Sequence, residues 1–359
     1  MGWTSRAASA GVAVLLVLAV PGTGVGAAPT VGSGAARSAP DTARAAQTDG
    51  LCERYRGVPE GFGRGSAGHP NRAGMVRLPG GTFRMGSEQG YHEEREVHAV
   101  SVTAFSIDRH EVTNAQFAAF VRATGYVTVA ERRSGATPAG SAVFVPPKAG
   151  GPADAAYRWW VWVPGANWRH PAGPGSTISG KDNHPVVHIA HEDARAYADW
   201  MGRSLPTEAQ WEYAARGGMD GAAYAWGNVP RPNGREMANT WQGSFPQSNS
   251  RADGHAGSAP VGCFPANGYG LYDMIGNVWE WTRDEYRPFH AAAPAVDPLV
   301  ATRNPGEAPG STGEIARVIK GGSFLCAPDF CVRYRPASRQ PQEAGVSTMH
   351  VGFRTVVNE

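Results

Sequence analysis

Two cysteines five residues apart, Cys326 and Cys331, constrain how this 359-residue chain folds more than any other feature. Five positions along a helix rotate a side chain well away from its starting face, and five along a strand place it on the opposite face. Two thiols that converge across this spacing therefore need a loop. Pro328 favours one, because it fixes its own φ and disfavours helix at the preceding residue. Converging thiols form either a disulfide or a site for a soft metal ion.

The N-terminus has the features of a secretory signal peptide, which we assign to residues 1–27. Arg6 supplies a positive charge ahead of an apolar stretch at residues 10–20, which is too short for a membrane span, and small residues at 25–27 suit cleavage. An uncleaved membrane anchor is the alternative. Residues 28–50 are rich in Ala, Gly, Ser and Thr, so we predict a flexible arm over 28–72. The mature chain is expected to be secreted or extracytoplasmic and free of the membrane.

An exported chain with four cysteines is expected to form disulfides. If Cys326 and Cys331 work as a pair, Cys52 and Cys263 are left to bridge each other. This prediction comes from counting, because spacing does not determine connectivity.

Composition narrows the classes of partner. The net charge is +2 and no Lys/Arg block occurs, which argues against nucleic acid or anionic membrane as a partner. Only 18% of the residues are charged, whereas Gly (47), Pro (28) and Trp (11) are frequent, which is typical of a loop-rich domain with an aromatic core.

Hydrophobic periodicity predicts few regular elements among many loops, and hence the α+β class. Two helices are marked by capping boxes, Thr113 with Gln116 and Thr207 with Gln210. The other predictions are a strand, a turn and a short strand at 75–84, a strand at 98–108, a surface insertion at 135–156, a helix at 192–201, and strands at 317–320 and 351–354.

Several motifs occur in order and resemble those of the formylglycine-generating enzyme family, also called sulfatase-modifying factors. The most specific are Gly-Ala-Asn-Trp-Arg-His-Pro at 165–171 and the Gly-Gly-Ser-x-x-Cys-x-x-x-x-Cys run at 321–331. The resemblance covers about residues 75–354. It implies one loop-rich α+β domain related to the C-type lectin fold, which we place at 73–357. Further matching segments lie at 79–87, 184–188, 205–213, 238–243, 267–273, 276–282 and 352–354.

The resemblance implies that the chain oxidises one cysteine in a Cys-x-Pro-x-Arg segment of an unfolded or nascent sulfatase to Cα-formylglycine, using O2 and copper, as a monomer. Cys326 and Cys331 would be the ligands of Cu(I), a soft ion that accepts two thiolates and leaves room for a substrate thiolate. Ser323 matches a serine close to the bound oxygen. Trp279 matches a tryptophan of the oxygen pocket, although it could simply belong to the core. Arg339 matches an arginine beside the substrate groove.

Calcium is also implied by the resemblance, since carboxylate, amide and backbone oxygens suit this ion. Asp253 and Asp273 could instead only cap turns. One implied site comprises Asn239, Thr240, Asp253 and His255, the second and last through backbone carbonyls, and the other comprises Asp273, Met274, Gly276, Val278 and Glu280.

Several positions near the expected substrate groove depart from the family pattern. Ala327 replaces a usual His, Phe330 a usual Tyr and His350 a usual Asn, and residues 343–347 also differ. We assign Phe330 and His350, with Arg339, to substrate binding. These departures bear on substrate preference and rate rather than on copper binding.

Two other functions compete with this interpretation. The altered groove residues suggest a non-catalytic binding protein on the same fold, with Cys326 and Cys331 as a disulfide. An iron-dependent sulfoxide synthase is disfavoured, because the sequence contains no additional helical domain. His184 and His188 resemble a metal pair, but we interpret them as structural because no third ligand lies nearby in the sequence.

Overall fold

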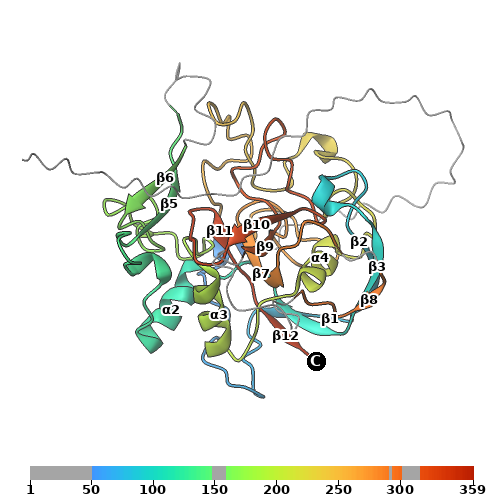
Figure 1. Cartoon of the computed structure of the whole chain (residues 1–359), viewed down its shortest axis with the longest axis horizontal. Helices are drawn as coiled ribbons and strands as arrows, with labels where there is room; N and C mark the ends of the chain where they lie inside the picture. Colours follow the sequence, from blue (N-terminus) through green and yellow to red (C-terminus); the bar gives the residue numbers. More distant parts are fainter. Residues whose placement is uncertain (1–50, 148–158, 291–292, 301–315) are drawn as a thin grey trace, which may run out of the picture. The chain divides into compact units, whose positions relative to one another are not determined.

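The strands of this chain are divided among small sheets rather than gathered in one large sheet (Figure 1). The computed structural model describes residues 51–147, 159–290, 293–300 and 316–359. The predicted signal peptide, residues 28–50 of the predicted arm and residues 148–156 of the predicted insertion lie outside these ranges. None of the helices in the described ranges is long and apolar enough to cross a membrane.

A four-stranded sheet in the order β10-β9-β7-β11 carries several predicted site residues. Strand β7 (Trp279–Glu285) pairs antiparallel with β9 (Ala316–Lys320) and parallel with β11 (Val351–Gly352), and β9 pairs antiparallel with β10 (Arg339–Glu343). The register places Val351 opposite Trp279. The sheet therefore places side by side two segments that are 72 residues apart in the chain, at the first residue of β7.

The N-terminal strand predictions were right in position but incomplete in pairing. Strands β1 (Met75–Leu78) and β2 (Gly81–Met85) belong to different sheets, because the chain turns at Gly80 and β1 pairs with β4 (Phe105–Asp108) while β2 pairs with β3 (His98–Val102). The predicted strand at 98–108 is thus two strands. The remaining partners are β12 (Val356–Asn358) beside β4 and β8 (Ala295–Val296) beside β3.

The predicted helices form where their capping signals stand. The Thr113 and Thr207 hydroxyls accept the N–H groups of Gln116 and Gln210, and each helix ends at a left-handed glycine. The α-helices are α1 (Leu51–Arg54), α2 (Asn114–Thr124), α3 (His191–Trp200) and α4 (Glu208–Arg216), and the 3-10 helices are His92–Glu94, Val129–Glu131 and Pro232–Gly234. Helix α4 packs on β2, β3, β7 and β9, and α2 contacts α3.

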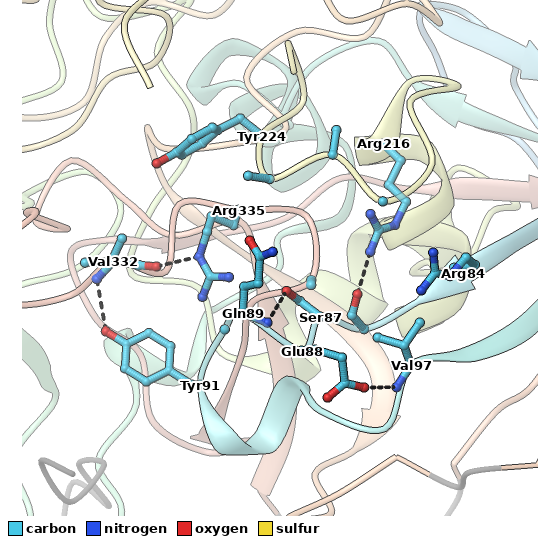
Figure 2. Close-up of a pocket in the computed structure, with 16 residues that line it drawn as sticks. Arg84, Ser87, Glu88, Gln89, Tyr91, Val97, Arg216, Tyr224, Val332 and Arg335 are labelled. Atoms are coloured by element: carbon cyan, nitrogen blue, oxygen red, sulfur yellow. Dashed lines mark hydrogen bonds between the residues drawn. The ribbon is translucent and has the colours of Figure 1, made fainter. Parts of the chain in front are cut away.

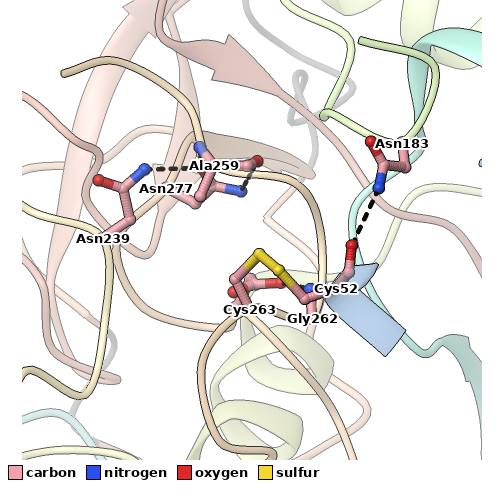
Figure 3. Close-up of a disulfide and its surroundings, with 8 residues drawn as sticks. Cys52, Asn183, Asn239, Ala259, Gly262, Cys263 and Asn277 are labelled. Carbon is pink, nitrogen blue, oxygen red and sulfur yellow. Dashed lines mark hydrogen bonds between the residues drawn. A yellow bond between two sulfur atoms is a disulfide. The ribbon is translucent and has the colours of Figure 1, made fainter. Parts of the chain in front are cut away.

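Two sequence expectations need correction. Residues 51–72 are not a flexible arm: Cys52 is disulfide-bonded to Cys263, as predicted (Figure 3). The Gly57 carbonyl also accepts a hydrogen bond from the Thr113 hydroxyl. The segment 135–156 is not merely a surface insertion, because its residues Gly140–Phe144 form the buried strand β5, which pairs with β6 (Trp160–Pro164). Small residues there permit close packing rather than exposure.

Candidate active site around the cysteine pair

Cys326 and Cys331 converge on one loop, as their spacing predicts. Their Sγ atoms lie 2.7 Å apart and both are free thiols in this structure. The Ala327 carbonyl accepts hydrogen bonds from the N–H groups of Phe330 and Cys331, which closes the loop around Pro328. Cys326 is buried, whereas Cys331 is half-buried. The two cysteines of the loop thus differ in their exposure to solvent.

The surroundings make the two thiols unequal. Burial raises the pKa of Cys326. The hydrogen bond from Cys326 and the charge of Arg333 lower the pKa of Cys331. Arg333 lies 3.8 Å from the ring centroid of Tyr91 and pairs with Glu93. The pair is therefore arranged to stabilise a thiolate on Cys331. Sequence reasoning missed Arg333 and Tyr91; the run of arginines directly after Cys331 was the available signal.

Trp279 and Ser323 lie on the buried side of the pair. Trp279 is 1% exposed and belongs to the same apolar cluster as Cys326. Ser323 is fully buried, its carbonyl accepts the N–H of Cys326, and its Oγ accepts the N–H of Leu325. Both predicted residues are thus brought to Cys326, and Trp279 is at the same time a core residue.

An aromatic wall stands on the accessible side. Phe330 is 40% exposed and stacks on Phe245 with 4.4 Å between ring centroids, and Trp159 meets it edge-on at 5.5 Å. His350 is mostly buried: its ring lies 4.7 Å from that of Trp160, and burial lowers its pKa to about 3. Of these two predicted substrate-binding residues, only Phe330 offers a broad open face.

The structure does not bring Arg339 to an open surface. Its guanidinium is 1% exposed and donates to both carboxylate oxygens of Glu208, at 2.8 and 2.9 Å, and to the Arg287 carbonyl. Burial alone would raise the pKa of Glu208, but Arg339 and Lys320 hold it well below its usual value. Substrate binding by Arg339 therefore stays a prediction. In this structure the residue is the first of strand β10, and its side chain is held in a buried ion pair with helix α4.

Two cavities adjoin the cysteine loop, and both are lined by Val332, which follows Cys331, and by Tyr224. The larger has a volume of 610 Å³ and contains Tyr91 and Arg335 (Figure 2). The smaller has a volume of 500 Å³ and contains Pro328 and Asp329 of the loop itself. The thiol loop is therefore bordered by open space on which a polypeptide could lie.

The first predicted calcium set is brought together around Asp253. The Asp253 carboxylate accepts the N–H groups of Thr240 and His255, so it caps a turn as well. Asn239 donates to the Gly257 carbonyl and to Asn277, but its own Oδ1 is buried and finds no hydrogen-bond partner among the described residues (Figure 3). A buried amide oxygen without a donor fits a hard cation.

The second predicted calcium set is less uniform. Glu280 is engaged with Arg354 through both carboxylate oxygens and with the Trp211 N–H. Asp273 is buried, and burial raises its pKa to about 7. Sequence reasoning missed Glu111, which is also buried, has an Oε2 without a partner among the described residues, and has a pKa raised by burial and by Asp273.

Glu280, Asp273 and Glu111 are three carboxylates, whereas Arg354 supplies one positive charge. Uncompensated buried carboxylates fit a cation at Asp273 and Glu111. Within the described ranges, however, no cluster of three or more His, Cys, Asp or Glu side chains is arranged to hold a metal ion. Backbone carbonyls, such as those predicted at Met274, Gly276 and Val278, would have to complete either calcium site.

His188 is structural in this structure, as its sequence context indicated. Its two ring nitrogens are bonded to Ser141 Oγ at 2.7 Å and to the Pro171 carbonyl at 2.9 Å. Burial lowers the pKa of His188 to about 4, so the ring is neutral near pH 7. His184 contacts Ser258 Oγ, whereas His188 contacts Ser141 and Pro171, so the two histidines have different partners.

Comparison with known proteins identifies the group to which this site belongs. Residues 65–359 match the family described as sulfatase-modifying factor enzyme 1-like domain. The chain belongs to this family. The fold prediction is confirmed: a mixed α and β, loop-rich single domain of the sulfatase-modifying factor type.

Two named proteins and one solved structure are similar to this sulfatase-modifying factor domain over most of its length. The formylglycine-generating enzyme of Mycobacterium tuberculosis is 53% identical, with the match covering 79% of this chain and 97% of that protein. A Bos taurus protein named inactive C-alpha-formylglycine-generating enzyme 2 is 45% identical over 80% of this chain and 89% of its own length. The solved structure of PvdO from Pseudomonas aeruginosa, at 25% identity, superposes with a TM-score of 0.55 and covers 79% of this chain and 93% of PvdO.

Proposed function

We propose that this chain is a formylglycine-generating oxidase that converts the cysteine of a Cys-x-Pro-x-Arg segment in an unfolded or nascent sulfatase to Cα-formylglycine. The observation that carries the proposal is the pair of free thiols, 2.7 Å apart, on a loop open toward two cavities. Its support from relatives is the 53% identity to a protein named formylglycine-generating enzyme.

The proposed reaction needs O2 and an external reductant. The substrate Cβ loses two electrons and its sulfur leaves as sulfide, while O2 takes four electrons and ends as the aldehyde oxygen and water. The other two electrons come from an external thiol, which ends as a disulfide. Copper, when bound, supplies the oxygen chemistry that side chains lack, and two converging cysteine sulfurs suit Cu(I).

The chain's own residues would prepare the site. Arg333 and the Cys326 thiol favour a thiolate on Cys331. Trp279 and Ser323 keep water from the buried face of Cys326, because both are almost without exposure. Phe330 and Phe245 provide an apolar wall on which the target segment packs.

The proposal is tested by mass spectrometry of a Cys-x-Pro-x-Arg peptide incubated aerobically with the mature protein and a thiol, with and without Cu(I). We expect copper-dependent conversion to an aldehyde that is lost in Cys326→Ser and Cys331→Ser. A Cys→Ser peptide is the control. An unchanged peptide together with absent Cu(I) binding would refute the proposal.

A second candidate is a non-catalytic peptide-binding protein with Cys326 and Cys331 joined as a disulfide. The 45% identity to a relative named inactive, and the departures at Ala327 and Phe330, favour it. Binding of the peptide without conversion, combined with a thiol count of zero in the native protein, would support this candidate over the oxidase.

We propose calcium as a structural ion at Asn239 and Asp253, with Thr240 and His255 as backbone ligands, and at Asp273 with Glu111. The unpartnered Asn239 Oδ1 and Glu111 Oε2 support the proposal. Calcium should raise the Tm and EDTA should lower it. Asp253→Asn should weaken this shift, whereas the exposed Asp182→Asn should keep it. A Tm that is insensitive to calcium in the wild type would contradict the assignment.

We also propose that the chain is exported and acts as a monomer. The Cys52–Cys263 disulfide supports an oxidising compartment. N-terminal sequencing of the mature protein and its mass by light scattering test the two points.

A further inference from the structure

The 610 Å³ cavity shown in Figure 2 borders the cysteine loop, but none of the side chains to which the proposed reaction assigns a role lines it. We call it the basic cavity and define it by Arg84, Arg216, Arg335, Gln89, Tyr224 and Val332. Figure 2 shows Arg335 on one side and Arg216 and Arg84 on the other, with Ser87 and Gln89 between them. Its volume lies within the range of about 300–1,000 Å³ that is typical of ligand pockets, so it has room for one or a few side chains.

The lining of the basic cavity contains three arginines and a single carboxylate, Glu88. Arg335 pairs with Glu94 and Arg216 pairs with Glu212, so Arg84 is the lining arginine without an ion pair among the described residues. Glu88 accepts the N–H of Val97, and nearby Asp220 accepts the backbone N–H of Arg84, so both carboxylates are already hydrogen-bonded to the backbone. An anion entering this space is therefore attracted mainly by Arg84.

Two of the guanidinium groups retain unused donors. Arg216 is 3% exposed and pairs with Glu212 at 2.6 Å, but its Nε is buried without a hydrogen-bond partner among the described residues. Arg84 is exposed, and its side chain takes part in none of the hydrogen bonds or ion pairs found within the described ranges. Planar guanidinium donors left open in this way match a carboxylate.

The basic cavity is joined to the cysteine loop by direct bonds. Val332 follows Cys331, its N–H donates to the Tyr91 hydroxyl at 3.1 Å, and its carbonyl accepts from Arg335 Nε at 2.9 Å. An extended chain advances about 3.3 Å per residue. A polypeptide with its cysteine at Cys331 therefore reaches the basic cavity within a few residues.

We propose that the basic cavity binds an acidic side chain of the substrate polypeptide, a few residues away from the target cysteine. The inference rests on the proposed function and narrows its substrate class: segments with an Asp or Glu at one flanking position are preferred. Arg84 contributes the accessible charge and Arg216 the buried donor.

The test uses fluorescent peptides in which the target cysteine is Ser, so that binding is measured without turnover. A single Asp is moved along each flank, and every Asp peptide is compared with its Asn counterpart by anisotropy. At one flanking position the Asp peptide should bind about three- to tenfold more tightly. Arg84→Glu should abolish that preference and favour Lys instead. Arg122→Glu, an exposed change on helix α2, is the matched control and should retain the wild-type preference.

Equal binding of Asp and Asn peptides at every position would overturn the proposal, as would a preference that survives Arg84→Glu. Inorganic phosphate that binds through Arg84 without weakening any peptide would also overturn it, because the cavity would then serve a free anion. If cysteine peptides are converted to the aldehyde but Asp peptides bind no better than Asn peptides, only the inference about the basic cavity is refuted. If Asp peptides bind better but no cysteine peptide is converted, only the proposed oxidase function is refuted.

Discussion

Cys326 and Cys331 lie on one loop but have different surroundings. Cys326 packs within the apolar cluster that contains Trp279, whereas Cys331 is half-buried near Arg333. In the proposed reaction, a substrate thiol is therefore expected to approach from the side of Cys331. The same asymmetry explains why the residues around Cys331, rather than those around Cys326, should set substrate preference.

Phe330 is the exposed aromatic residue next to the accessible thiol. Phe330→Ala would remove the ring that stacks on Phe245, so the KM for a Cys-x-Pro-x-Arg peptide should rise about tenfold. The kcat should change little, because the thiols stay in place. Phe330→Tyr keeps the stack and serves as the control in steady-state kinetics. A fall in kcat at unchanged KM would contradict this role.

His350 should make the protein less stable in acid. Its pKa is lowered to about 3 by burial, against an ordinary value of 6.5, so the unfolded chain binds a proton that the folded one does not. Above pH 6.5 the ring is neutral in both states, and the free energy of unfolding has its full value. As the pH falls from 6.5 toward 3, the free energy of unfolding decreases by about 1.4 kcal/mol per pH unit. His350→Asn should flatten the unfolding free energy against pH in that window. Urea titrations at several pH values measure it, with exposed His69→Asn as the control, and an unchanged slope would contradict the prediction.

At the scale of elements, local signals determine the helices. The Thr113 and Thr207 capping boxes act within four residues, and both helices begin where the sequence predicts. Strand pairing depends on distant partners. Strands β1 and β2 are separated only by Pro79 and Gly80, yet they pair with β4 and β3 of different sheets. No local pattern distinguishes this arrangement from a hairpin.

Thr113 should matter more than Thr207, although both cap a helix. Thr113→Ala loses the cap of helix α2, worth about 1 kcal/mol, and also the hydrogen bond to the Gly57 carbonyl. Thr207→Ala loses only its cap, so the free energy of unfolding should fall less. Thr113→Ser should restore most of the loss. Chemical denaturation ranks the three variants, and equal losses for the two alanine variants would contradict the contact with Gly57.

At the scale of the whole molecule, a covalent bond and a buried charge network are among the contacts that connect distant segments. The disulfide joins residues 211 positions apart. Glu208 and Glu212 of helix α4 bind Lys320 and Arg339, which lie at the end of β9 and the start of β10. This network ties the helix to the sheet that carries Trp279.

Removal of the disulfide should lower the stability of the entire domain. Cys52→Ser should cost about 2–5 kcal/mol of unfolding free energy, because the long loop no longer restrains the unfolded chain. Cys263→Ser should behave identically, and the double variant should be no worse than either single one. Equilibrium denaturation measures the three. Additive losses would show that the cysteines act separately rather than as a bond.

The sequence by itself determined what short-range chemistry controls. It predicted two of the helices from their caps, the thiol loop from its spacing and proline, and the family from ordered motifs. Tertiary structure alone decided which strands pair, that residues 51–72 are held against the domain, and that Arg339 is buried against Glu208. It also revealed Glu111 beside Asp273 and the basic cavity near Cys331. The reason is physical: caps and turns are interactions between near neighbours, whereas burial, ion pairing and cavities arise only when residues distant in the chain come together.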